Sequence, residues 1–209
     1  MDSGRKIFVV RHGQSTWNGQ RRISGQLDPP LSAKGRRQAE YLARALRNLD
    51  LSGIYSSSLS RAVETARPVA DFHQLPITRC DDLREIDLGI LQGRYRDERD
   101  TEAQELWKER SLNKRHFQVF GGETFEELEC RVRSCLDGIL KTDARGSLLI
   151  VGHRSTNRVL LSTLMNWTDE TAITLNLRSK YLYEVILGGT PQIYTVQPSL
   201  GVRHPGFRA

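Results

Sequence analysis

Two histidines of this chain each follow a short apolar run, with one residue between the run and the histidine. Residues 8–10 (FVV) lead to His12, and residues 149–151 (LIV) lead to His153. Such runs predict buried strands, and ligands of open α/β sheets lie beyond the carboxyl ends of parallel strands. We therefore expect the two histidines to meet across one crevice, although two unrelated histidines would show the same pattern.

An arginine adjoins each histidine: Arg11 precedes His12, and Arg154 follows His153. Histidine is a common zinc ligand, so a metal site is one interpretation. Guanidinium groups, however, bind phosphate oxygens bidentately, whereas metal sites usually gather carboxylates and thiolates. The neighbours favour an anion site over a cation site, although adjacent side chains need not point the same way.

The overall charge also suits an anionic partner. The 209 residues include 31 Lys or Arg and 25 Asp or Glu, a formal net charge of +6. The basic residues are scattered, without a long basic run and interleaved aromatics, so we expect no nucleic-acid partner. The first residues lack a signal-peptide pattern, and no apolar stretch is long enough to span a bilayer. These features predict a cytoplasmic protein with no membrane partner.

The three cysteines argue against a structural staple. Cys80, Cys130 and Cys135 are an odd number and form no CxxC pair. Neither a disulfide framework nor a zinc knuckle is expected from this arrangement. With the anion site favoured at the histidines, we expect no metal and no cofactor.

Apolar runs that alternate with amphipathic segments predict an α/β fold. The expected strands are 6–10, 53–57, 77–80 and 148–151, with a hairpin at 181–187 and 192–196. The polar stretch 11–31 is a long loop of the kind that carries function. The predicted architecture is a three-layer α/β/α sandwich with a mostly parallel central sheet and an antiparallel edge strand. Its length fits a single domain over residues 1–209.

Helix signals lie between these strands. Helices are expected after the cap Ser32, over 59–72, over 96–110, behind a Thr124–Glu127 capping box, and over 157–165. Within the second of them, Pro68 predicts a kink or an early break.

Six segments, met in order along the chain, resemble motifs of the histidine phosphatase superfamily. This family includes the cofactor-dependent phosphoglycerate mutases and the fructose-2,6-bisphosphatases. The segments are residues 11–18 (RHGQSTWN), 27–35 (LDPPLSAKG), 55–66 (YSSSLSRAVETA), 83–89 (LREIDLG), 121–124 (GGET) and 151–153 (VGH). The matches span about residues 6–165, and together they are far more specific than the first motif alone.

The resemblance implies a role for each matching catalytic residue. His12 would be the nucleophile that takes the phosphoryl group, and Arg11 and Arg61 would clamp its oxygens. His153 would be the remaining contact, cationic while phosphate is bound. Glu85 would protonate the leaving alcohol and then deprotonate the water that hydrolyses the phosphohistidine.

General chemistry supports these roles. Phosphoryl transfer depends mostly on positioning and on stabilising charge at the equatorial oxygens, which two arginines and a histidinium supply without magnesium. A neutral imidazole is a competent nucleophile near pH 7, and nearby arginines disfavour its protonation. A glutamate that acts as an acid has to hold its proton, so its site is expected to disfavour ionisation, and bound phosphate nearby would have that effect.

Four further residues are candidates for substrate binding. The resemblance implies a hydrogen bond from Asn18 to phosphate and places Ser24 and Gly25 at a position that touches substrate. Arg154 departs from the family, in which glycine or another small residue usually follows the second histidine. This arginine either extends the anion site or points away from it.

A second departure separates hydrolysis from mutase activity. The mutases carry Arg-His-Tyr just after the catalytic glutamate, where residues 86–88 here are Ile-Asp-Leu, which cannot grip a carboxylate or a phosphate. They also insert a longer segment before the second histidine, whereas Glu85 and His153 are only 68 positions apart here. We therefore predict a metal-independent phosphomonoesterase, a histidine acid phosphatase-type phosphoric monoester hydrolase.

The predicted substrate is a small phosphorylated metabolite of unassigned identity. Sugar phosphates, phosphoglycerate derivatives, phosphoserine and a cobalamin-precursor phosphate all remain open. Residues from about 94 to 120 are expected to form a lid or substrate segment, and Lys114, Arg115 and Arg154 are candidates for a second anionic group. By analogy with the family, a homodimer is also left open.

Two alternatives remain. A cofactor-dependent phosphoglycerate mutase would move phosphate between carbons and need priming by a bisphosphate, whereas the phosphatase releases inorganic phosphate. A catalytically weak phosphoprotein-binding module would keep its binding after Glu85→Gln while its wild-type turnover stayed negligible.

Overall fold

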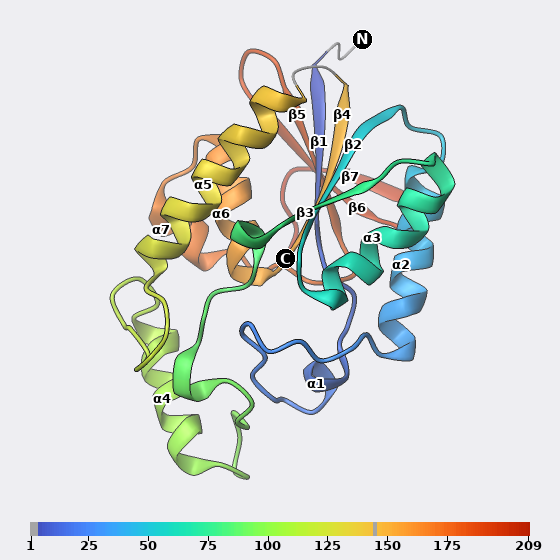
Figure 1. The fold of residues 1–209 in the computed structure, drawn as a ribbon. Coiled ribbons are helices and arrows are strands. Elements are labelled where there is room, and N and C mark those ends of the chain that lie inside the picture. The colour runs from blue at the N-terminus through green and yellow to red at the C-terminus, as the bar shows by residue number, and fades with distance from the viewer. Residues whose placement is uncertain (1–3, 144–145) are drawn as a thin grey trace.

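The computed structural model describes residues 4–143 and 146–209. Within these ranges a seven-stranded sheet runs in the order β3-β2-β4-β1-β5-β6-β7 (Figure 1). The strands are Arg5–Arg11 (β1), Leu51–Ser57 (β2), Ile77–Cys80 (β3), Ser147–Gly152 (β4), Leu182–Leu187 (β5), Gln192–Gln197 (β6) and Val202–Pro205 (β7). The first four pair in parallel and the last three pair antiparallel.

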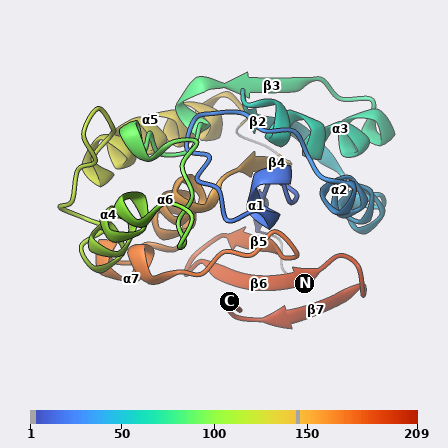
Figure 2. The same cartoon turned by 90° about the horizontal axis from the view of Figure 1, so that it is seen from below.

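Helices cover both faces of the sheet, as the views in Figures 1 and 2 show. They are Thr16–Gly19 (α1), Ala33–Leu46 (α2), Ser60–His73 (α3), Thr101–Leu112 (α4), Phe125–Thr142 (α5), Arg154–Met165 (α6) and Asp169–Thr174 (α7), with 3₁₀ turns at Asp81–Leu83 (η1) and Gly89–Leu91 (η2). The pair α2 and α3 packs on one face, and α5 and α6 pack on the other. The predicted three-layer α/β fold is therefore confirmed. No helix in the described ranges is long and apolar enough to cross a membrane.

The central strands are apolar because both of their faces are covered. In β1, Ile7 and Val9 join the core under α5 and α6, whereas Phe8 and Val10 join the core under α2 and α3. Strands buried on both faces lack polar alternation, which is why residues 6–10 and 148–151 were recognisable from the sequence. The register pairs Arg11 with Gly152, so the residues after β1 and β4 emerge side by side.

Three local expectations need correction. Helix α3 does not break early at Pro68 but continues to His73, because the buried Val69 and Ala70 hold the last turns against the sheet. The helix expected at 96–110 starts only at Thr101, where Asp100 caps it. The antiparallel edge holds three strands, since β7 adds to the predicted hairpin by pairing with β6.

Candidate active site

The two histidines meet at the carboxyl ends of adjacent parallel strands. His12 directly follows β1 and His153 directly follows β4, and their ring centroids are 5.0 Å apart. Both rings are buried, with exposed fractions of 4% and 0%. The interpretation as two unrelated histidines is therefore wrong, and the predicted crevice exists.

The His12 ring is held in one tautomer. Its Nδ1 lies 2.7 Å from the Gly13 carbonyl oxygen, which can only accept, so Nδ1 carries the hydrogen. The unprotonated nitrogen is then Nε2. Burial, with repulsion from Arg11 and Arg61, holds the pKa of His12 well below its usual value. The loop is itself fixed, because the Gly13 N–H donates to the Thr65 hydroxyl at 3.0 Å.

His153 is also neutral without an anion beside it. Its Nε2 lies 2.8 Å from the Ser57 hydroxyl, and its Nδ1 has no partner among the described residues. Burial lowers its pKa well below the usual value, and Arg61 and His12 add to this effect. The negative charge of an arriving phosphate would oppose the effects of burial and repulsion and favour the cationic ring.

Arg61, from the first turn of α3, is positioned by the loop that precedes α2. Its side chain is 1% exposed; Nη2 donates to the Gly25 carbonyl at 2.7 Å and Nη1 to the Leu27 carbonyl at 2.7 Å. Asp28 pairs with Nη1 at 3.2 Å. The motif around residue 28 therefore serves to hold the arginine of a distant helix.

Arg11 stands at the end of β1 with few protein partners. Its Nη1 donates to the Leu177 carbonyl at 3.3 Å, and its buried Nε has no partner in the described ranges. Burial, followed by repulsion from Arg154, lowers the pKa of Arg11 to about 9. A desolvated guanidinium of this kind is stabilised by an incoming anion.

Glu85 lies against the first turn of α6. Its two carboxylate oxygens accept backbone N–H bonds at 3.0 Å from Ile86, Arg154 and Ser155. Such donors, at a helix N-terminus, stabilise a carboxylate. The carboxylate is therefore held between the Ile86 N–H and the first turn of α6.

The substrate-binding candidates lie in the same cavity. Asn18 accepts the Ser15 N–H through Oδ1 at 3.1 Å, which leaves its amide hydrogens as the donors. Ser24 has a buried hydroxyl without a partner among the described residues. Gly25 has a φ of +51°, and a Cβ there would lie 2.2 Å from Gln92 Oε1, so a side chain at this position does not fit.

The cavity around these groups has a volume of about 270 Å³ and is strongly cationic. Its basic lining residues are Arg11, Arg22, Arg61, Arg96, Arg110, Lys114, Arg154 and Arg158. Within the described part of the chain, Glu85 is the one carboxylate that lines it. The cavity therefore suits an anionic ligand. Eight of the nine residues predicted for the site line it, and the ring of the ninth, His153, lies 5.0 Å from that of His12.

Sequence reasoning missed several lining residues. Arg96, Arg110 and Arg158 match no motif, although Arg158 follows Arg154 by four positions on one helix face, which was a usable signal. Of the second-anion candidates, Lys114 and Arg154 line the cavity. Arg115 does not, because it reaches Glu129 of α5 at 3.7 Å instead.

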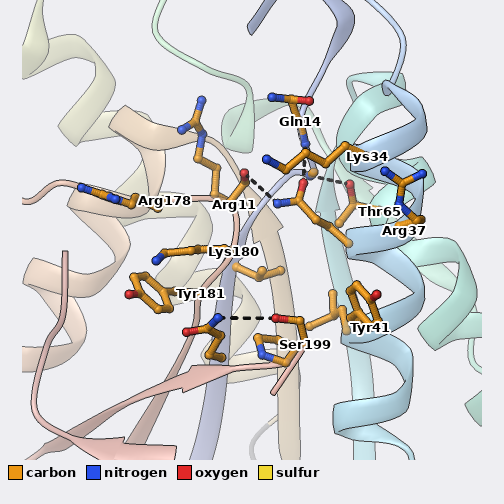
Figure 3. A pocket seen from close by; sticks show the side chains of 17 residues that line it. Arg11, Gln14, Lys34, Arg37, Tyr41, Thr65, Arg178, Lys180, Tyr181 and Ser199 are labelled. Atoms are coloured by element: carbon orange, nitrogen blue, oxygen red, sulfur yellow. Dashed lines mark hydrogen bonds between the residues drawn. The ribbon is translucent and has the colours of Figure 1, made fainter. Parts of the chain in front are cut away.

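A second, larger cavity of about 470 Å³ is lined in part by Gly13 and Gln14, the two residues that follow His12 (Figure 3). Lys34 and Arg37 of α2 line it together with Arg178 and Lys180 from the loop before β5. It contains neither histidine nor Glu85, so it is not the reaction chamber. Arg11 lines both cavities.

The buried histidines make stability depend on pH. Their folded-state pKa values lie below the usual 6.5, so the unfolded chain takes up protons first as the pH falls through 6.5. The contribution of the two neutral histidines to the free energy of unfolding is fully present above pH 6.5. Lowering the pH from 7.5 to 5.5 is expected to cost about 1.4 kcal/mol per histidine. Urea unfolding at both pH values measures it.

His12→Gln is the control for this pH effect. It should remove about half of the histidine contribution, while the contribution of the carboxylates stays the same in both proteins. Equal pH slopes for wild type and variant would contradict the assignment of His12 as a buried neutral ring.

Comparison with known proteins agrees with this geometry. Residues 7–191 match the family model described as "Histidine phosphatase superfamily (branch 1)". A protein of Enterobacter sp. (strain 638), named "Probable phosphoglycerate mutase GpmB", is 35% identical over 175 residues, 83% of this chain and 81% of that protein.

Two solved structures extend the comparison. A mycobacterial glucosyl-3-phosphoglycerate phosphatase superposes with a TM-score of 0.74 at 25% identity, covering 87% of this chain and 90% of that one. The α-ribazole phosphatase of Shigella flexneri superposes with a TM-score of 0.83 and covers 98% and 100%. At 23% identity, this second likeness shows the shared fold alone.

Proposed function

The chain belongs to the histidine phosphatase superfamily, and from this premise we propose that it hydrolyses a small phosphomonoester through a phosphohistidine on His12. The observation that carries the proposal is the tautomer of His12. Its Nδ1–H is fixed on the Gly13 carbonyl, so the lone pair of Nε2 is available within a cavity of arginines. A neutral, buried imidazole among phosphate-binding groups is suited to attack phosphorus.

In the first step, His12 Nε2 attacks phosphorus and the bond from phosphorus to the ester oxygen breaks. Arg11, Arg61 and His153 would stabilise the charge on the three equatorial oxygens. The departing alkoxide takes a proton from Glu85 and leaves as the neutral alcohol. Glu85 acquires that proton when the phosphate dianion enters and stabilises the protonated acid.

In the second step, water attacks the phosphohistidine and the N–P bond breaks. Glu85, now a carboxylate, accepts the proton of that water, and inorganic phosphate forms. His12 returns to its starting tautomer, since the Gly13 carbonyl has held Nδ1–H throughout. Each proton that Glu85 gives in the first step is recovered in the second, so the cycle closes without another reagent.

Hydrolysis is proposed over mutase activity because of the residues beside Glu85. Ile86 and Leu88 are buried and line the cavity with apolar surface. Asp87 is used by the main chain, since its Oδ1 accepts the Gly89 N–H at 2.8 Å. A mutase has to hold and re-present its phosphorylated intermediate, and this stretch offers no donor for that. The mycobacterial relative is likewise named as a phosphatase.

The test is release of inorganic phosphate from 4-nitrophenyl phosphate and from 3-phosphoglycerate, with the carbon products identified. The phosphatase proposal expects free phosphate with glycerate and no 2-phosphoglycerate. Conversion to 2-phosphoglycerate that requires priming by a bisphosphate would instead establish the mutase. Binding of a phosphopeptide without turnover of any ester would favour the phosphoprotein-binding module.

Activity is expected to be independent of divalent metal. Among the described residues, no group of three or more His, Cys, Asp and Glu side chains is arranged to hold a metal ion. Phosphate release should therefore stay within about twofold after dialysis against EDTA, because the arginines supply the charge that magnesium supplies in other phosphoryl-transfer enzymes. Loss of activity that zinc or magnesium restores would contradict this expectation.

We also propose that residues 1–209 act as one domain in the cytoplasm, with 94–120 as the substrate segment. Helix α4, within that segment, lies beyond the carboxyl ends of the strands and beside the catalytic end of the molecule (Figures 1 and 2). Trp107, Arg110 and Lys114 bring this segment into the cavity wall. The segment is therefore positioned to select the alcohol part of the ester.

A further inference from the structure

We propose that the substrate carries a second anionic group, a carboxylate or a second phosphate, and that Arg110, Arg158 and Lys114 bind it. This inference rests on the proposed phosphatase function and names the substrate class of the same site. The proposed anion-binding residues differ from the Arg-His-Tyr run of the mutases, because residues 86–88 here carry no cation. The anion would be held by α4 and α6 instead.

Burial is the first observation that supports this second site. Arg110 is 7% exposed and Arg158 is 8% exposed, yet neither forms an ion pair with a carboxylate of the described residues, and the one carboxylate that attracts both of them is Glu85 in the same cavity. Buried arginines are almost always paired, because desolvation of an unpaired charge is costly. Two of them facing one cavity therefore indicate a ligand of opposite charge.

Hydrogen bonding is the second observation. The Nε of Arg158 donates to the Leu175 carbonyl at 2.8 Å, which fixes the side chain from behind. The Arg110 guanidinium carbon lies 5.7 Å from the centre of the Trp107 ring, and this side chain donates no hydrogen bond within the described residues. Both guanidinium groups keep donors for a ligand, and planar guanidinium forks suit carboxylate and phosphate oxygens.

Repulsion among the cations is the third observation. Arg154, one turn before Arg158 on α6, lines the same cavity and repels both Arg11 and Arg158. Burial and then repulsion from Arg158 and Arg110 lower the pKa of Lys114. Phosphate at His12 relieves the repulsion at one end, and a second anion would relieve it at the other.

The cavity also limits the distance between the two anions. Its volume of about 270 Å³ lies at the low end of small-molecule sites. Ile86 and Leu88 line part of it with apolar surface. The part of the ligand that joins its two anionic groups is therefore short. A compact bis-anion fits this description, whereas an ester with a large uncharged alcohol does not.

The test compares matched ligands that differ in the second anion. One pair is 3-phosphoglycerate and glycerol 3-phosphate, which differ by a carboxylate. The other is fructose 1,6-bisphosphate and fructose 6-phosphate, which differ by a phosphate. Calorimetric titration of the His12→Ala protein should show at least about tenfold tighter binding of the bis-anion in one pair, and the pair identifies the anion. Equal affinities within both pairs would overturn the proposal.

Variants assign the preference to the named residues. Adding Arg158→Met or Arg110→Met should weaken binding of the preferred bis-anion about tenfold and change its mono-anionic partner less than about threefold. Arg67→Met, which removes an exposed cation from α3, is the control and should change neither. Equal losses for both ligands would indicate a merely structural role and contradict the subsite.

The same ligands separate this inference from the proposed function. Wild-type turnover of either mono-anionic ester without preference for its bis-anion would leave the phosphatase standing and remove the subsite. Preferential binding of a bis-anion without any phosphate release would keep the subsite and remove the phosphatase. Thermal unfolding of each variant within about 3 °C of wild type shows that the fold is intact.

Discussion

Replacing His12 by alanine is expected to reduce phosphate release by about 10⁴-fold or more. The reason is that the proposed mechanism makes Nε2 of this ring the nucleophile, and removal of a nucleophile that acts with its neighbours removes nearly all the turnover. Binding should survive, because Arg11, Arg61 and His153 remain. The measurement is kcat for 4-nitrophenyl phosphate with EDTA present, together with calorimetric binding of phosphate.

A matched histidine variant controls for nonspecific effects. His204→Ala, on β7 at the far edge of the sheet, should keep wild-type kcat. Acid-labile, base-stable label from ³²P-labelled substrate should appear on the peptide that contains residue 12 in wild type. Equal turnover by wild type and His12→Ala would show that another group is the nucleophile.

Glu85→Gln is expected to have the second largest effect, and its size should depend on the leaving group. Glutamine keeps an acceptor for the Arg154 and Ser155 N–H groups but holds no transferable proton. Formation of the phosphohistidine from glycerol 3-phosphate should fall about 10²- to 10⁴-fold, the usual contribution of a general acid. With 4-nitrophenyl phosphate, whose 4-nitrophenolate group leaves without needing a proton, the phosphorylation rate should fall less than about tenfold.

Rapid mixing separates the two steps of this reaction. In the variant, a burst of nitrophenol should precede a slow steady state, because water attack on the phosphohistidine still lacks its base. Quenched-flow analysis of both esters gives the phosphorylation rates directly. A loss of the same size for both esters would rule out Glu85 as the acid and leave it a structural cap of α6.

The fold and the residues that gather at the candidate active site were largely readable from the sequence. Strands β1 and β4 are short, continuous apolar runs because helices cover both of their faces, and such runs are visible without a structure. Motifs placed Arg11, His12 and Glu85 at the site because the chemistry restricts each of those positions to one residue type. The family assignment followed from the same segments.

Local signals were less reliable where long-range packing competes with them. Of the two outcomes expected at Pro68, a kink or an early break, the break does not occur, because Val69 and Ala70 are buried against the sheet and the helix continues to His73. Strand β7 had no strand pattern of its own and exists through its pairing with β6. The donors that hold Glu85 were also not visible in its motif, since two of them come from α6, 69 and 70 positions away.

The sequence by itself therefore determined the layers of the fold and the residues that meet at the candidate active site, because strand burial and reaction chemistry restrict residue types position by position. Only the tertiary structure decided which scattered cations act together. Arg110 and Arg158 lie on different helices, and nothing in the spacing of two arginines on separate amphipathic segments distinguishes a solvated pair from a buried one. Burial without a carboxylate partner is a property of the packed molecule, and it is what identifies the second anion site.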